Sequence, residues 1–362
     1  MPSSRSVVTD LTPASWALSD DQQGLRATAR QFARERLEPL LVHQPDAALW
    51  SETVRLAATL DLAAMILPEQ KGGMGISRHD LALVVEQFAA GPLERAAELT
   101  LSSPALMTLR EYDALDRLSD RDTRHYFDGS TSIAPGIPDI NASGLWVLRR
   151  HPASPVMMVR MDDKRPQLVL ATLPAGQEEI RGAAPVAVLG ALSIERYTVV
   201  PADDAPIPVA SRDEDNFGPD PVRQSLVDTA IYFATLLSGA LQQCVDFALA
   251  YSVTRQTFRK PIVAHQLVAA RLADMLASAH TIHLVLRSVA AQDTQAQIAS
   301  VSQMARHVAT EAMDVARELV QLCGGHGYVK GLPPAARFQT VHWFAMLLMK
   351  VEAALRTFIA SA

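Results

Sequence analysis

The stretch YSVTRQTFRKPIVAHQLVAARLADM, residues 251–275, carries a short polar segment between two apolar helical periods. Its first arginine, Arg255, offers a planar fork of donors that can bind a pyrophosphate in bidentate fashion. Phe258 follows one helical turn later and offers a flat face beside that fork, a combination that suits a dinucleotide. By itself the segment predicts a single helical turn that breaks at Pro261.

Helical periodicity continues on both sides of this stretch. Four long apolar periods cover residues 222–253, 263–292, 295–322 and 338–359, and the third runs into the breaker sequence CGGHGYVKGLPP at residues 323–334. We expect these periods to pack as a helix bundle that spans residues 221–362.

The rest of the chain divides into a helical part and a strand-rich part. Residues 20–116 carry apolar side chains at helical spacing, with Asp20, Ser51 and Ser77 in N-cap positions. The following residues show short apolar runs separated by Pro, Gly, Asp and Asn, at roughly the 8–12-residue spacing of antiparallel sandwiches and barrels. The sequence therefore predicts an α+β protein with an N-terminal helical domain, a middle β domain and a C-terminal helical bundle, at residues 1–128, 129–220 and 221–362.

The composition is that of a globular protein, with 49% hydrophobic and 20% charged residues. The net charge of -6 is spread without long runs of one sign, which argues against nucleic acid as a partner. Because the start of the chain lacks a signal-peptide core and no long apolar run stands out, we expect a cytoplasmic protein with no membrane partner. Cys244 and Cys323 are too far apart for a paired zinc site, and the histidines form no metal-spaced cluster, so no metal is predicted.

Three strings occur in a fixed order along the chain. ILPEQKGGMGISRHDLALVVEQFAAGPL at residues 66–93 comes first, the opening stretch is second, and QLCGGHGYVKGLPP at residues 321–334 is third. In this order and at these distances they resemble motifs of the acyl-CoA dehydrogenase family, with Glu86 as that family's helix-borne Glu. The resemblance implies a helical domain, a middle β-barrel and a C-terminal four-helix domain. It also implies flavin-dependent α,β-dehydrogenation of an acyl-CoA thioester.

The resemblance further implies a cofactor and the residues that hold it. In the family, the second and third strings contact an FAD that is bound mainly by the neighbouring subunit. This assigns FAD contacts in the present chain to Arg255, Phe258, His265, Gln266, Gln321, Gly324 and Gly325. The glycines suit this role physically, because a backbone without side chains can bring its N–H groups close to a phosphate or an adenosine edge.

The sequence departs from the family at the catalytic base. Removal of the α-proton requires a carboxylate over the flavin, and most members carry it in a Tyr-Glu-Gly-Thr-like string whose positions here hold Leu347 and Leu348. Other members carry the base on the first helix of the C-terminal domain, where Thr229 is the aligned residue and Asp228 its neighbour. Asp228 and Glu352 are the remaining candidates, although Asp228 is turned by about 100° from the aligned position and Glu352 is expected on a solvated helix face.

The middle domain departs from the family as well. In place of the family's Thr-Glu-Pro and Gly-Ser-Asp strings, which line the flavin and the acyl-CoA, the chain carries PGIPDINASGLWVL at residues 135–148. Trp146 lies in the region of a flavin-edge aromatic, but a tryptophan in a strand is more often a core residue.

The family motifs that the chain retains and those that it lacks are together compatible with three hypotheses. The first is the non-catalytic subunit of a heteromeric enzyme, similar to the α2β2 acyl-CoA dehydrogenases of bacterial steroid side-chain degradation, which completes the FAD site of a second acyl-CoA dehydrogenase subunit. The second is a homo-oligomeric FAD enzyme with a relocated base, and the third is a cofactor-free scaffold. The sequence does not identify the acyl group of the substrate.

Overall fold

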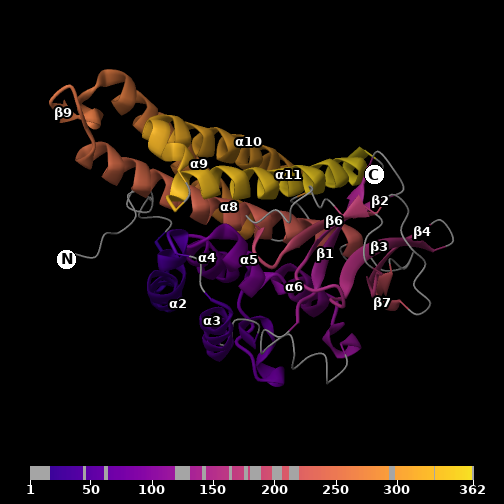
Figure 1. The fold of residues 1–362 in the computed structure, drawn as a ribbon. Helices are drawn as coiled ribbons and strands as arrows, with labels where there is room; N and C mark the ends of the chain where they lie inside the picture. Colours follow the sequence, from indigo (N-terminus) through magenta and orange to yellow (C-terminus); the bar gives the residue numbers. More distant parts are fainter. Residues whose placement is uncertain are drawn as a thin grey trace.

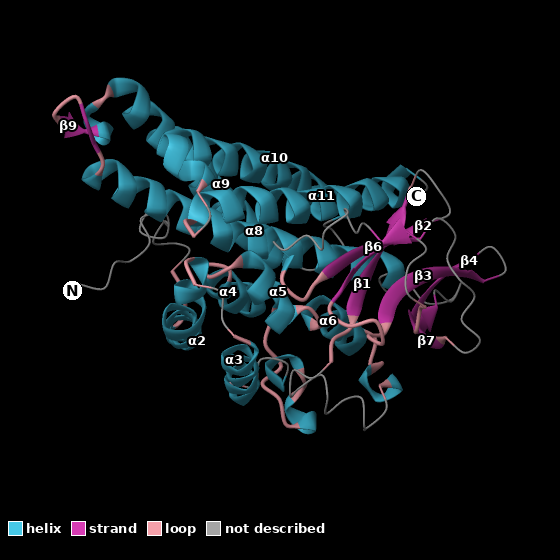
Figure 2. Cartoon of the chain, viewed as in Figure 1, coloured by secondary structure: helices cyan, strands magenta, loops and turns pink. Residues whose placement is uncertain are grey.

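The predicted order of helices, strands and helices is confirmed by the computed structural model. Helices from the N-terminal part lie against one long helix of a C-terminal bundle, and the strands of the middle part gather at one end of the molecule (Figures 1 and 2). The structure describes residues 17–43, 46–60, 64–118, 131–140, 144–162, 165–174, 178–179, 189–197, 206–211, 220–292, 298–329 and 331–360.

The described residues of the N-terminal part are mainly helical. Its α-helices are α2 (Asp20–Phe32), α3 (Ala47–Thr59), α4 (Arg78–Phe88), α5 (Leu93–Thr100) and α6 (Ser103–Glu111). Shorter turns of 3₁₀ or π type occupy Ala33–Leu37, Glu38–Leu41, Ala64–Ile66, Glu69–Lys71 and Leu115–Arg117. α2 and α4 pack together, and α4 in turn packs on the bundle, so this part forms a layer beneath the long helices.

Two of the three expected N-caps are wrong. Ser19 rather than Asp20 caps α2, and Asp46 rather than Ser51 caps α3. Ser51 lies inside its helix, where its hydroxyl donates to a backbone carbonyl one turn earlier. Ser77 caps α4 as predicted, in a reciprocal capping box with the third residue of the helix.

The described residues of the middle part form one seven-stranded sheet in the order β5-β6-β2-β1-β3-β4-β7. Its strands are β1 (Ala134–Asp139), β2 (Gly144–Arg149), β3 (Val156–Asp162), β4 (Arg165–Ala171), β5 (Glu178–Glu179), β6 (Ser193–Tyr197) and β7 (Ile207–Ser211). The pairing is antiparallel, as the strand spacing indicated, except that β1 and β3 run parallel. The sheet is therefore mixed, with β1 joining its two antiparallel parts.

The C-terminal part is a bundle of four long helices. These are α8 (Pro221–Thr254), α9 (Gln266–Ala290), α10 (Ile298–Cys323) and α11 (Pro333–Ala360). α8 is long and apolar enough to cross a membrane, but 72% of its most apolar window is buried inside the fold. It packs against α10, α11, α9 and α4, which is the environment of a core helix.

The polar segment between α8 and α9 is a β-hairpin and not the helical turn expected from the sequence. β8 (Gln256–Thr257) pairs with β9 (Lys260–Pro261), and a 3₁₀ turn at Ile262–Ala264 follows. The chain reverses at Phe258 and Arg259, whose φ angles of 52° and 63° are left-handed. The hairpin lies at the end of the bundle that is far from the sheet (Figure 1).

Candidate functional site

An open pocket of about 360 Å³ lies at the hairpin end of the bundle. The end of α8, the hairpin and the end of α10 with the following turn Gly324–Tyr328 enclose it. Its lining residues are Tyr251, Arg255, Thr257, Ile262, Leu322, Cys323, Gly324, Gly325 and His326. We call it the hairpin pocket. It combines a guanidinium, an imidazole and exposed backbone with no carboxylate among these residues, a set that suits an anion.

Arg255 is fixed by its backbone and free at its side chain. Its N–H donates to the Tyr251 carbonyl at 2.8 Å, and its own carbonyl accepts from the Ile262 N–H at 2.9 Å. Within the described residues its guanidinium makes no hydrogen bond or ion pair, and the residue is exposed. The hairpin therefore holds the base of this side chain while all five of its donors stay available to a ligand.

The two glycines of the hairpin pocket leave space beside the backbone. A Cβ added at Gly324 or Gly325 would meet no heavy atom within 4 Å. Gly324 has a φ of 57°, which other residues adopt only with strain. A flat or anionic ligand can therefore approach this backbone closely.

The other predicted FAD contacts are near the hairpin pocket without lining it. Phe258 is 86% exposed, and its ring meets that of His265 edge-on, with centroids 6.1 Å apart. The His265 Nε2 is buried and has no hydrogen-bond partner among the described residues. Gln266 is the first residue of α9, and Gln321 lies in the last turn of α10; both residues are exposed. The structure thus brings Arg255 and the two glycines together and leaves the other four on the adjoining surface.

The sequence reading missed a tyrosine–histidine pair in the hairpin pocket. The Tyr251 hydroxyl lies 3.0 Å from the Nδ1 of His326 and donates to the Cys323 carbonyl at 3.3 Å. Burial raises the pKa of the Tyr251 hydroxyl. Tyr251 lies in the last turn of α8, four residues before the C-cap residue Arg255, and this spacing was the signal that could have found it.

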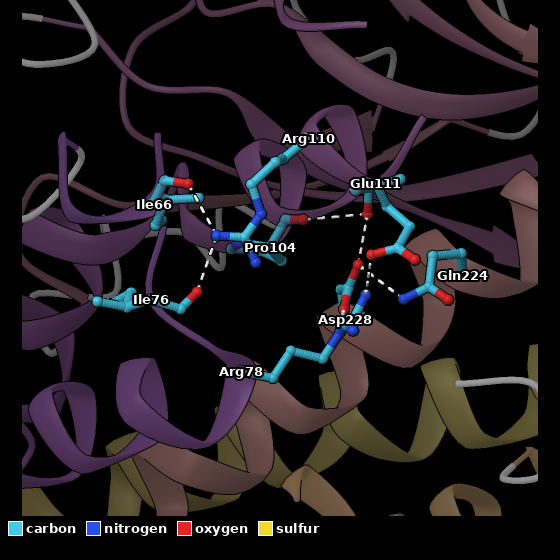
Figure 3. A network of polar contacts seen from close by, with 9 residues as sticks. Ile66, Ile76, Arg78, Pro104, Arg110, Glu111, Gln224 and Asp228 are labelled. Atoms are coloured by element: carbon cyan, nitrogen blue, oxygen red, sulfur yellow. Dashed lines mark hydrogen bonds and ion pairs between the residues drawn. The ribbon is translucent and has the colours of Figure 1, made fainter. Parts of the chain in front are cut away.

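Asp228, one of the two candidate bases, is bound on several sides in a buried network (Figure 3). Its carboxylate accepts from the Arg78 Nε at 2.5 Å, the Thr108 hydroxyl at 2.8 Å and the Gln224 amide at 3.1 Å. The cavity beside it measures about 20 Å³, which is room for one water. A carboxylate held by three donors and without space for a substrate is a poor proton acceptor, so Asp228 ties α4, α6 and α8 together.

The arginines around Asp228 are equally engaged. Burial lowers the pKa of Arg78, but Asp228 and Glu111 outweigh this effect and raise it above its usual value. Arg110 donates to the carbonyls of Ile66 and Ile76, both at 2.8 Å, and so fixes the chain segment before α4 (Figure 3). The network is a structural joint among helices that lie far apart in the sequence.

The second candidate base, Glu352, and the positions aligned with the family's base lie in the helix core. Thr229 is buried and donates to a backbone carbonyl of α8. Leu347 and Leu348 are fully buried in α11, which runs without a break through these positions. Glu352 was expected on a solvated face, but it is 2% exposed, accepts from the Ser302 hydroxyl at 3.2 Å and pairs with Arg356 at 2.9 Å. That expectation is wrong because the residue faces α10 across the bundle.

Trp146 is buried in β2, as expected of a core tryptophan. Its Nε1 donates to Asp139 at 3.1 Å. The Lys350 ammonium lies 4.9 Å from the ring centroid and the Arg196 guanidinium 5.4 Å from it. The indole is thus engaged by two cations of the protein itself. Lys350 comes from α11, so this contact joins the bundle to the sheet.

Two family models match the chain. The acyl-CoA dehydrogenase N-terminal domain matches residues 19–112, and the acyl-CoA dehydrogenase C-terminal domain matches residues 220–351. The chain belongs to the acyl-CoA dehydrogenase family. This membership indicates an oxidoreductase that acts on acyl-CoA substrates and supports FAD as the cofactor.

Individual acyl-CoA dehydrogenases are similar along nearly the whole chain. Isobutyryl-CoA dehydrogenase of Bos taurus is 23% identical over 90% of this chain and 85% of its own length. Benzylmalonyl-CoA dehydrogenase of Aromatoleum aromaticum is 22% identical over 87% and 91%. The structure of butyryl-CoA dehydrogenase from Megasphaera elsdenii matches with a TM-score of 0.70 at 17% identity, over 93% of this chain and 98% of that one. These likenesses confirm the acyl-CoA dehydrogenase fold.

The hairpin pocket fits one end of FAD. Arg255 would hold the diphosphate, and the open backbone of Gly324 and Gly325 would admit the adenosine or phosphate edge. The unpartnered Nε2 of His265 lies on the same hairpin end of the bundle. FAD supplies the hydride acceptor for the oxidation. The chain's own contribution there would be to bind and orient the dinucleotide.

Proposed function

We propose that this chain is a subunit of a flavin-dependent acyl-CoA dehydrogenase that contributes FAD contacts across a subunit interface. The base that takes the α-proton comes from a second subunit. The observation that carries the proposal is the hairpin pocket, where Arg255, which has no ion pair among the described residues, and the open backbone of two glycines line one cavity.

The surroundings of both candidate bases support the proposal that the base comes from a second subunit. Asp228 is occupied by three donors, and Glu352 by a hydroxyl and a guanidinium. Leu347 and Leu348 are buried in an unbroken helix. A carboxylate that abstracts a proton needs a free oxygen facing the substrate, and none of these positions offers one.

The exposed apolar side chains support an interface at the hairpin end. Phe258 and Leu267 are 86% and 81% exposed, and Val253 is exposed near them in sequence. Tyr328 and Val329, at the end of the turn that follows α10, are exposed as well. A partner that covers this surface would bury apolar area and shield the hairpin pocket from water. The assembly we propose is an α2β2 heterotetramer.

Flavin content tests the proposal. The chain purified alone is expected to hold far less than stoichiometric FAD, and the chain co-expressed with a second acyl-CoA dehydrogenase subunit encoded beside it is expected to be yellow and active. Stoichiometric FAD with acyl-CoA turnover in the chain alone would favour a homo-oligomer with a relocated base. A colourless, inactive complex would favour the cofactor-free scaffold.

Arg255 is the residue to change first. Arg255→Ala removes a charge-assisted contact of about 1.5–3 kcal/mol, or roughly tenfold to a hundredfold in FAD affinity. Arg255→Lys should restore little, because an ammonium does not reproduce the planar fork. Bound FAD after gel filtration of the complex measures both variants. Since the side chain has no partner within the described chain, the melting temperature of the apoprotein should stay unchanged.

A further inference from the structure

The pairing of the hairpin places one more cation on the face of Arg255. Thr257 is the cross-strand partner of Lys260, and the backbone hydrogen bond from Ile262 to Arg255 extends the same ladder. Directly opposed residues of an antiparallel pair project their side chains to one face. Arg255, Thr257 and Ile262 all line the hairpin pocket. Lys260 therefore projects to the pocket side of the hairpin.

The charge of Lys260 is unused inside the protein. The residue is exposed and makes no hydrogen bond or ion pair within the described part of the chain. The diphosphate of a dinucleotide is a dianion, and the guanidinium of Arg255 neutralises only one of its two charges. None of the residues that line the pocket is acidic. After Arg255 has neutralised one charge of the diphosphate, one negative charge of the ligand remains, and Lys260 is a cation on the same side of the hairpin that can neutralise it.

We propose that Lys260 is the second cationic arm of the hairpin pocket and positions the second phosphate of the bound dinucleotide. This inference rests on the proposed function, because it assumes that the hairpin pocket is a diphosphate site. Arg255 binds as a flat fork, whereas the Lys260 ammonium acts as a mobile point charge that adjusts to the other phosphate. Lys260 thus selects a diphosphate over a monophosphate.

Arg259 provides a matched control next to Lys260. It is also a cation that is exposed and unpaired within the described residues, but it lies in the reversal and outside the ladder. Lys260→Gln and Arg259→Gln remove the same charge from adjacent residues. They lower the general attraction for anions equally, so that a difference between them reports the face on which each side chain lies.

The test is calorimetric titration of the full chain with ADP and with AMP. Wild type should bind ADP more tightly than AMP. Lys260→Gln should lose about tenfold in ADP affinity, the size of one charge-assisted contact, with AMP affinity nearly unchanged. Lys260→Arg should restore the preference for ADP, and Arg259→Gln should keep it.

The possible failures separate the two proposals. Equal losses of ADP affinity in Lys260→Gln and Arg259→Gln, or no loss in either, would overturn the proposed role of Lys260 but not the assignment of the hairpin pocket as a diphosphate site. Loss of ADP and AMP binding together, with a lower melting temperature in Lys260→Gln, would show a structural lysine and overturn it too. If neither the wild-type chain nor its complex with the second subunit binds either nucleotide at millimolar concentration, the hairpin pocket is not a diphosphate site, and the proposed function fails with it.

Discussion

Two arginines of this chain, Arg78 and Arg255, occupy opposite environments. Arg78 is bound to Asp228 at 2.5 Å and to Glu111 at 3.5 Å, inside a joint of three helices. Arg255 lines an open pocket and makes no ion pair among the described residues. A buried charge needs a partner from its own chain, because water cannot replace it. A charge left without one in an open pocket is available to a ligand, so the first arginine serves the fold, and binding is the role that we propose for the second.

The largest expected effect comes from breaking the joint at Asp228. Asp228→Ala leaves Arg78, Thr108 and Gln224 without their common acceptor, and we expect a loss of about 3–5 kcal/mol in the free energy of unfolding. Urea denaturation of the purified chain measures it. Glu111→Gln is the matched control, because it removes the more exposed partner of Arg78 and should cost less than about 1 kcal/mol.

The same variant also tests the role assigned to Asp228. If Asp228→Ala were as stable as wild type and the complex lost only its turnover, Asp228 would be the base after all. The buried network around Asp228 would then serve catalysis and not the stability of the fold.

Two glycines, one in the contact between α8 and α4 and one in the hairpin pocket, extend the comparison with a smaller expected loss of stability. A Cβ at Gly239 would collide with the Glu86 carbonyl and lie 2.8 Å from the Ala89 Cβ, where α8 and α4 approach closely. Gly239→Ala should therefore destabilise the fold by about 1–3 kcal/mol. Gly325→Ala meets nothing within 4 Å and should leave the melting temperature unchanged while it weakens ADP binding. Thermal denaturation and titration of both variants decide it, and equal melting temperatures would contradict the close approach.

The fold was predictable because its signals are local. The 3.6-residue period marked all four bundle helices, and short apolar runs marked the strands. What failed depended on contacts distant in sequence. Serine and aspartate both cap helices, so local sequence could not choose between Asp46 and Ser51. The parallel pairing of β1 and β3 leaves no mark in either strand.

The candidate site was predictable only where a family motif reached it. Arg255 and the two glycines lie in one pocket, and their roles as FAD contacts stay predictions. The hairpin was missed because a short polar segment with a proline fits a broken helix as well as a turn. The Arg78–Asp228 pair joins residues separated by 150 positions, and no local pattern signals such a contact.

The smallest expected effect concerns the carboxyl group of Glu94, on α5. Glu94 is half-buried and has no ion pair among the described residues, and burial raises its pKa to about 7 against the opposing effect of Arg337 and Arg95. The folded state therefore binds more protons than the unfolded state between pH 4.5 and 7. The contribution of Glu94 to stability falls as the pH rises through this window, and the deficit is complete above it.

Replacing Glu94 removes that deficit. Glu94→Gln should be more stable than wild type at pH 8, on the order of 1–2 kcal/mol after allowance for partial exposure, and the two proteins should converge below about pH 4.5. Glu98→Gln should be less stable than wild type at pH 8, because the Glu98 carboxylate accepts from Trp50, Arg95 and the Ala191 N–H, and the variant loses these charge-assisted bonds. Denaturation midpoints from pH 4 to 8 give both curves. If Glu94→Gln were less stable than wild type at pH 8, Glu94 would have a partner that stabilises its charge. The rule that a buried charge without a partner lowers the stability of the fold would then not apply to this residue.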